Sequence, residues 1–195
     1  MGSEFIVTNL MYNLPMELTN ESENITLKQL ELSHADKIFT LIDKNREYLA
    51  PWFWWVKETK SVDDSLRFLE IEKEKYEKKT GITCGIWYRE ELVGLVSLNE
   101  IDIHTNSAVI GYWLDNDFQG KGIMTNSCKL LINYAFKVLK LHRIEILHAE
   151  QNEKSKAVIQ RLGFVHEGHF REATLVNGKY LDDEFYSLLE SEWKE

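Results

Sequence analysis

The sequence predicts an α/β fold in which a mixed, mostly antiparallel central sheet is flanked by helices. Three observations lead to this prediction. Three short apolar runs follow one another between residues 82 and 114 and are separated by polar turns, which is typical of an antiparallel meander. An amphipathic helical pattern then leads to another apolar run. Finally, Asn177-Gly178 joins two further runs and is the strongest short signal for a β-hairpin.

The first elements are one strand and one helix. Residues 25–32 alternate apolar and polar side chains, as a half-buried strand does. Ser33 followed by Asp36 has the spacing of a capped helix start. Apolar residues then recur at helical spacing, and the helix is expected to end before Pro51.

A second helix and the meander follow. Ser61 with Asp64 is another capped start, and it begins a highly charged helix. The runs 82–88, 92–101 and 108–114 are the three expected strands of the meander, because each is short, apolar and bounded by turn residues.

The second half predicts two more helices and the hairpin. Residues 122–140 place apolar side chains on one side and lysines on the other, as in an amphipathic helix. Residues 142–149 are expected to form a strand. The next segment is a short helix with Asn152 at its N-cap and Gly163 just past its end.

Length and composition indicate the organisation of the chain. With 195 residues, 44% of them hydrophobic, one domain is expected over residues 6–195, after a cloning-site scar at residues 1–5. No apolar run is long enough to cross a bilayer and no leader-like segment begins the chain, so a soluble, cytoplasmic protein is expected. Cys84 and Cys128 stand far apart and away from any histidine cluster, so neither a disulfide nor a metal site is expected.

The net charge of the chain restricts the classes of partner that it is expected to bind. Because 23 Lys plus Arg stand against 32 Asp plus Glu, the formal net charge is −9, which disfavours nucleic acids and acidic membranes. A cationic partner would be attracted. An acidic surface also serves solubility alone, so both interpretations stay open.

Gly120-Lys121-Gly122 lies where a strand is expected to end and a helix to begin. It is not a P-loop, because Asp115 occupies the upstream glycine position. It is not a dinucleotide fingerprint either, because Thr125 replaces the third glycine. Free amides at a helix N-terminus beside a glycine turn still predict a site for an anion such as a pyrophosphate, and an ordinary turn is the alternative.

This loop and its surroundings carry a family resemblance. Gln119 and Gly122 fit a Gln or Arg, two residues, Gly, one residue, Gly or Ala pattern, from which Met124 departs. The runs IGYWL, NEKS and RLGF complete the likeness between residues 107 and 164. They resemble the acetyl-CoA core of the GNAT superfamily of N-acetyltransferases, and the resemblance extends over nearly the whole chain from residue 25. Among the branches, the chain most resembles the bacterial enzymes that acetylate the N-termini of ribosomal proteins.

The resemblance implies that acetyl-CoA is the co-substrate, that no metal takes part, and that the acetyl group passes directly to an amine. The pantetheine arm would run beside Trp113 and Leu114, where the family's strand splays and leaves amides free for the thioester oxygen. The pyrophosphate would bind the loop amides of Gln119, Gly120, Lys121, Gly122, Ile123, Met124 and Thr125.

Asn152 and Ser155 are the catalytic residues that the resemblance implies. Asn152 matches a residue that holds the pantetheine or organises nearby water, and Ser155 matches one that donates a proton to the departing CoA thiolate. Many members use a Tyr at the position of Ile159, so Ser155 is the better candidate for the acid. Local chemistry alone also allows a structural role for both, because Asn is favoured at an N-cap and Ser in a first turn.

The general base is left open. Related enzymes often have Glu where this chain has Val109 and Thr174, so both usual carboxylates are missing. Glu100 and Glu172 are alternatives to which the sequence does not commit, and a water chain is another.

Two further clusters are not assigned a catalytic role. His166 and His169 are three residues apart, and strand alternation places them on opposite faces, so they are not expected to share an ion. The aromatic residues 52–55 follow the first helix, where the resembled family has substrate loops. They are expected to divide between core packing and the walls of an acceptor pocket.

The sequence therefore predicts an acetyl-CoA-dependent N-acetyltransferase, with a basic ribosomal-protein N-terminus as the favoured acceptor. A polyamine or an aminoglycoside fits the negative charge equally well. A module that binds CoA without catalysis is the alternative from another class. A homodimer is implied by resemblance alone.

Overall fold

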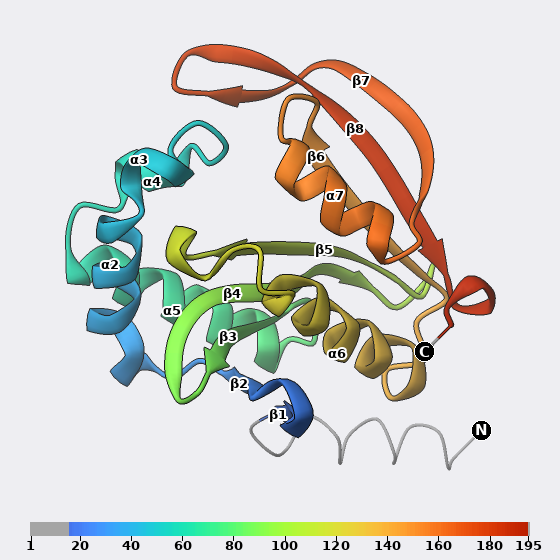
Figure 1. Cartoon of the computed structure of the whole chain (residues 1–195), viewed down its shortest axis with the longest axis horizontal. Coiled ribbons are helices and arrows are strands. Elements are labelled where there is room, and N and C mark those ends of the chain that lie inside the picture. The colour runs from blue at the N-terminus through green and yellow to red at the C-terminus, as the bar shows by residue number, and fades with distance from the viewer. Residues whose placement is uncertain (1–15, 195) are drawn as a thin grey trace.

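An eight-stranded sheet runs through the structure, a computed structural model that describes residues 16–194 (Figure 1). The expected scar at residues 1–5 and the expected domain start at residue 6 lie outside the described residues. The strand order is β1-β2-β3-β4-β5-β6-β8-β7; within it β5 and β6 pair in parallel and the other neighbours are antiparallel. The strands are β1 (Glu17–Asn20), β2 (Ile25–Gln29), β3 (Ile82–Tyr88), β4 (Glu91–Asp102), β5 (Ser107–Leu114), β6 (Arg143–Ala149), β7 (Val165–Val176) and β8 (Lys179–Leu189).

Helices cover both faces of the sheet, so the core has two parts. The helices are α2 (Ala35–Lys44), α3 (Arg46–Leu49), α4 (Trp55–Glu58), α5 (Val62–Glu77), α6 (Ile123–Lys137) and α7 (Glu153–Arg161). α6 packs on one face, where Cys128 and Leu131 are fully buried. α2 and α5 pack on the other face through Ile38 and Leu69. Each fully buried aliphatic side chain stabilises the fold by about 1.5–3 kcal/mol.

The structure confirms the predicted fold class, the meander, the amphipathic helix and the hairpin. β3, β4 and β5 are successive antiparallel neighbours, and α6 forms within the expected range 122–140. The hairpin closes at Asn177 and Gly178, whose φ angles of 54° and 82° both lie in the left-handed region. A two-residue type I′ turn requires this conformation, which Asn-Gly adopts readily.

The prediction for the first helix is wrong in detail. β2 ends at Gln29, earlier than expected, and a 3₁₀ turn capped by Glu31 precedes α2. Ser33 therefore does not cap the helix. Instead, Ser33 Oγ donates to the Glu31 carboxylate at 3.3 Å. The helix is also divided into α2 and α3, which a single residue, Asn45, separates. At the break, buried Asn45 donates from Nδ2 to the Leu41 carbonyl at 2.9 Å, and such side-chain bonds compete with the helical ladder.

The prediction that His166 and His169 lie on opposite faces is also wrong. A bulge in β7 between His166 and Gly168 adds one residue, which returns His169 to the side of His166. Both rings bond the Glu184 carboxylate, His166 Nε2 at 2.5 Å and His169 Nδ1 at 2.8 Å. Within residues 16–194, no group of three or more His, Cys, Asp or Glu side chains is arranged for a metal ion.

The bulge residue Glu167 is held by two donors. Arg143 Nη1 lies 3.1 Å from its Oε1, and the Ser187 hydroxyl donates to it at 2.7 Å. The Arg143 hydrogen bond, followed by that of Ser187, lowers the pKa of Glu167 from 4.5 to about 2. A carboxylate with a lowered pKa stabilises the fold above its unfolded-state pKa, and this contribution is lost as the pH falls towards about 2.

Glu167→Gln should therefore lower the free energy of unfolding by about 0.5–1 kcal/mol at neutral pH, because the pair is partly exposed and screened by solvent. The difference from wild type should vanish near the lowered pKa, at about pH 2. Urea unfolding at both pH values measures it, with Glu70→Gln at an exposed position of α5 as control. A difference that persists in acid would contradict this origin.

Candidate active site

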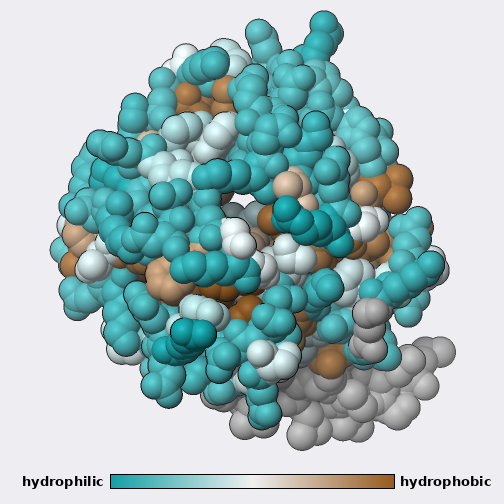
Figure 2. All heavy atoms as spheres, viewed as in Figure 1, coloured by the Kyte–Doolittle hydropathy of each residue, from teal (hydrophilic) through white to brown (hydrophobic). Residues whose placement is uncertain are grey.

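A central cavity of about 910 Å³ is lined by β5 and β6, the loop before α6, the start of α7, the segment after α3 and the β7–β8 hairpin. Figure 1 shows these elements arranged around the middle of the molecule, and Figure 2 shows the surface hollowed there. A volume of this order is typical of cavities that hold a small molecule or a cofactor.

The cavity begins where β5 and β6 part. The two strands pair over three residues, up to Val109 opposite Glu145. Beyond this point, residues 110–114 of β5 and 146–149 of β6 line the cavity. Among the described strands, none pairs with this edge of β5 beyond Val109, so its backbone amides can donate to a ligand oxygen. The expected splay of the strand is confirmed.

Buried Asp115 anchors the loop that follows β5. Its carboxylate accepts from Lys44 Nζ at 2.7 Å and from the Asp117 amide at 3.1 Å. Asn45 Oδ1 accepts from the Asn116 amide at 2.9 Å. The hydrogen bonds to Asp115 and Asp117 raise the pKa of Lys44. The end of α2 and the loop thus hold each other, which fixes the glycines further along the loop.

Gly120 and Gly122 both lie in the left-handed region, with φ angles of 72° and 75°. Glycine adopts this conformation without a Cβ penalty. α6 begins directly afterwards, and the Asn126 amide makes a helical bond to the Gly122 carbonyl at 3.0 Å. The amides before Asn126 have no helical acceptor, and the helix dipole adds positive potential. The loop therefore has the backbone geometry of an anion site.

Most of the predicted cofactor residues line the cavity. They are Trp113, Leu114, Gln119, Gly120, Gly122, Ile123, Met124, Thr125 and Asn152. Lys121 is the exception, because its Nζ lies over the Phe118 ring at 4.8 Å and donates to the Asp117 carbonyl at 3.0 Å. A role for Lys121 in cofactor binding stays a prediction.

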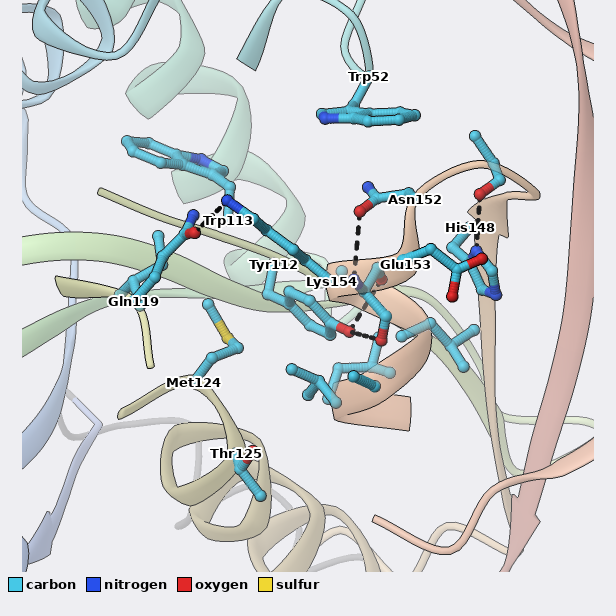
Figure 3. Close-up of a pocket in the computed structure, with 18 of the residues that line it drawn as sticks. Trp52, Tyr112, Trp113, Gln119, Met124, Thr125, His148, Asn152, Glu153 and Lys154 are labelled. Carbon is cyan, nitrogen blue, oxygen red and sulfur yellow. Dashed lines mark hydrogen bonds between the residues drawn. The ribbon is translucent and has the colours of Figure 1, made fainter. Parts of the chain in front are cut away.

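A different lysine lies beside the loop. Lys154 on α7 donates from Nζ to Gln119 Oε1 at 2.6 Å, as Figure 3 shows, and lies over the Tyr48 ring at 4.7 Å. Lys154 and Tyr48 both line the cavity. The start of α7 therefore supplies a positive charge at the loop, which the sequence pattern does not reveal.

The two predicted catalytic residues lie at the start of α7, where Figure 3 labels Asn152. Asn152 is the N-cap, and its Oδ1 accepts from the Ser155 amide at 3.2 Å, as expected. Ser155 Oγ lies 3.0 Å from the Tyr112 hydroxyl. The Ser155 hydroxyl is thus positioned by a neighbour from another element and lines the cavity at the same time.

Tyr112 reaches from β5 to α7 and links the two walls of the cavity. Burial raises the pKa of its phenol, so Tyr112 stays neutral and hydrogen-bonding near neutral pH. The sequence does not mark it, because Tyr112 is one of several aromatic and apolar residues in its strand. Its contact with Ser155 spans 43 positions of the chain.

Aromatic residues 52–55 divide between the cavity and the core. The first two line the cavity. Trp55 packs in the core at 6.3 Å from the Trp113 ring, whereas the Trp54 side chain is largely exposed. Phe53 also packs against the core, so two of the four have the expected core role, whereas Trp54 has neither expected role; a wall of an acceptor pocket stays a prediction for the others.

The β7–β8 hairpin supplies the acidic wall of the cavity. The Thr174 hydroxyl donates to the Asp183 carboxylate, and Asp183 is 6% exposed. At the hairpin tip, Asn177 Nδ2 donates to the Ala50 carbonyl at 2.7 Å, which joins the hairpin to the segment after α3. A buried carboxylate in a cavity that aromatic side chains also line suits a cationic or amine ligand.

The structure places no carboxylate in the cavity at the four positions considered for the general base. Val109 lies in the paired part of β5, and Thr174 lines the cavity without a carboxylate of its own. Glu100 and Glu172, the alternatives, are exposed and do not line the cavity.

Comparison with known proteins gives consistent matches. Residues 24–165 match the family model described as an acetyltransferase (GNAT) domain. The putative ribosomal N-acetyltransferase YdaF of Bacillus subtilis (strain 168) is 38% identical over 174 residues, which cover 89% of this chain and 95% of YdaF. The spermidine N(1)-acetyltransferase of Escherichia coli (strain K12) is 34% identical over 159 residues, which cover 82% of each chain. The structure of RimL, a ribosomal alpha-N-protein acetyltransferase in complex with coenzyme A, has a TM-score of 0.86 at 27% identity, over 89% of this chain and 98% of RimL.

The fold is shared with solved GNAT acetyltransferases, one of which, RimL, was solved in complex with coenzyme A. The match over most of its length shows that the chain belongs to the GNAT acetyltransferase family. It is an acetyl-CoA-dependent N-acetyltransferase, and the predictions of family and enzyme class are confirmed. Within residues 16–194, no helix is long and apolar enough to cross a membrane.

Proposed function

We propose that this enzyme acetylates the N-terminal amine of a protein, and that a basic ribosomal protein is the favoured acceptor. The observation that carries the proposal is one cavity lined by two unlike groups: free helix amides at the glycine loop, and buried Asp183 of the hairpin together with Trp52 and Phe53. The first group suits a pyrophosphate and the second an amine. The names of YdaF and RimL and the net charge of −9 support a basic ribosomal acceptor.

The proposed donor site follows the cavity wall. The pyrophosphate of acetyl-CoA would bind the loop amides of residues 119–125, and the pantetheine arm would lie beside Trp113 and Leu114. Asn152 would hold the arm or a nearby water while it caps α7. The thioester oxygen would accept from β5 amides beyond Val109, and each such donor contributes roughly 3 kcal/mol to the stability of the transition state.

The proposed reaction is a direct transfer. The amine nitrogen attacks the thioester carbonyl carbon, the C–N bond forms, and the C–S bond then breaks. Ser155 Oγ–H would donate a proton to the departing thiolate. Without that proton, the thiolate would be a poor leaving group in a buried site. Tyr112, 3.0 Å from Ser155 Oγ, would orient this hydroxyl.

A polyamine is the second candidate acceptor. The relative named spermidine acetyltransferase supports it, as does the acidic wall at Asp183, which would hold a second ammonium of the same molecule. An aminoglycoside is a polycation of related chemistry and belongs in the same test.

Acetyl-CoA-dependent thiol release tests the acceptor. The enzyme is offered a basic N-terminal peptide, a neutral one, spermidine and an aminoglycoside in separate assays. A matched control is the basic peptide with its α-amine already acetylated and its lysines intact. We expect release with the free N-terminus and none with the blocked one, because the proposal assigns the reacting nitrogen to the α-amine.

The other outcomes are equally informative. Release with the blocked peptide would move the reaction to lysine side chains, and release with spermidine alone would favour the polyamine. Binding of acetyl-CoA without release from any acceptor would favour a CoA-binding module. A ribosomal acceptor would be met in the cytoplasm, so cytoplasmic localisation stays a prediction, as does a homodimer.

A further inference from the structure

His148, near the end of β6, lines the cavity with a buried ring. Its side chain is 5% exposed and stacks on Tyr186, with the ring centroids 5.5 Å apart. Nδ1 lies 2.7 Å from the Ala149 carbonyl oxygen, as the dashed line in Figure 3 shows. Because a carbonyl can only accept, Nδ1 carries the hydrogen of the neutral ring and Nε2 carries the free lone pair.

Nε2 of His148 is buried and has no hydrogen-bond partner among residues 16–194. Leaving a buried polar nitrogen unsatisfied costs about 1–3 kcal/mol, and native structures seldom carry this cost without a reason. The cavity that His148 lines is where the proposed function places the thioester and the amine. Because Nε2 is buried, a ligand atom or its water reaches it only after a small shift of the ring, and this contact would satisfy Nε2.

The transfer also needs a proton acceptor, which Val109 and Thr174 do not provide. Three described side chains that line the cavity are acidic or imidazole groups: Asp183, Glu153 and His148. The Asp183 carboxylate accepts from the Thr174 hydroxyl and has the role of counter-ion to the amine ligand. The Glu153 side chain is 76% exposed, so it is solvated rather than enclosed with the substrates. His148 is the one of the three whose side chain has a buried nitrogen without a hydrogen-bond partner among the described residues.

We propose that His148 accepts the proton of the attacking amine, an inference that rests on the proposed amine acetylation. As the amine nitrogen bonds to the thioester carbonyl carbon, its surplus N–H proton passes to Nε2, directly or through one water. The C–S bond then breaks, and the thiolate takes the proton that Ser155 Oγ donates. The imidazolium releases its proton to solvent and Ser155 regains one, so the products are the amide and the free thiol.

The titratable groups that face His148 come mainly from β8 and β7. Tyr186 stacks on the ring, and Glu184 is the register partner of His148 across β6 and β8. The Glu184 carboxylate is bonded by His169 and by His166, and the first of these is the larger cause that lowers its pKa. The His166 and His169 rings both contact the Glu184 carboxylate, so these two histidines form a cluster around an acidic partner of their own.

The test uses the amine that the wild-type enzyme turns over fastest. His148→Gln keeps a polar side chain of similar size but cannot take up a proton. We expect kcat to fall about 100-fold, while the Kd for acetyl-CoA, from calorimetric titration, changes less than about twofold. The rise of kcat/KM on the acid side of the pH profile should change in the variant, because that limb reports the base of the free enzyme. Added imidazole should restore part of the rate of His148→Ala.

His166→Gln is the matched control, because His166 contacts the same Tyr186 ring at 4.9 Å but does not line the cavity. It should retain the wild-type kcat and pH profile. A wild-type rate in His148→Gln would overturn the inference, and so would a loss of acetyl-CoA affinity as large as the loss of kcat. A wild-type enzyme that acetylates no amine would instead overturn the proposed function on which the inference rests.

Discussion

Replacing Gly122 with valine should raise the Kd for acetyl-CoA by about 100-fold, or about 2.8 kcal/mol. Gly122 has a φ of 75°, a conformation in which a β-branched residue is a strained outlier. Its new methyl groups would also stand next to Asn126, at the start of α6, where the proposed pyrophosphate meets the free amides. Calorimetric titration with acetyl-CoA and with CoA measures the loss.

Gly163→Val separates this effect from backbone strain. Gly163 has a φ of 81° and nothing within 4 Å of an added Cβ, and it lies past the end of α7, outside the cavity lining. It should lower the melting temperature about as much as Gly122→Val and leave the Kd unchanged. Unchanged affinity in a folded Gly122→Val protein would contradict the loop assignment.

Ser155→Ala should lower kcat by about 100- to 1,000-fold, the range for loss of a positioned proton donor. The Kd for acetyl-CoA should stay within about twofold of wild type, because binding does not need the proton. The N-cap survives the change, since Asn152 Oδ1 accepts from the Ser155 backbone amide, which alanine keeps. Steady-state kinetics and calorimetric titration separate the two quantities.

Tyr112→Phe extends the same prediction. It removes the hydroxyl that lies 3.0 Å from Ser155 Oγ but leaves the ring in the cavity wall. The same hydroxyl also donates to the Ser155 carbonyl at 3.2 Å. We expect a smaller loss of kcat, about tenfold, in line with the loss of the one hydrogen bond that positions Ser155 Oγ. A wild-type rate in Ser155→Ala would leave Ser155 with a structural role in α7 alone.

The parts of this fold that local rules control could be predicted from the sequence. The Asn177-Gly178 turn needs left-handed residues, and the Asn152 cap needs only its own side chain and an amide three residues later. The anion geometry of the loop was foreseeable as well, because the glycine turn and the helix start are adjacent in the chain. For the same reason, most predicted cofactor residues line one cavity.

The parts that failed or were missed depend on distant contacts or on one added residue. Asn45 divides the first helix and also accepts from the Asn116 amide, 71 positions away. A bulge has no reliable sequence signal, so the prediction that His166 and His169 lie on opposite faces of their strand was wrong. Tyr112 and His148 are recognised as site residues because the strands that carry them part around a common space.

The cavity lining has a consequence for how acceptor preference can diverge. The lining attributed to the donor comes from residues between 110 and 161, whereas the rest of the lining comes from residues 48–53 and from Thr174 and Asp183 of the hairpin. Mutations in these two outer segments can reshape the acceptor side while the acetyl-CoA side is inherited intact. Selection can therefore act on the two substrates separately, which suits a scaffold whose relatives carry the names of different acceptors.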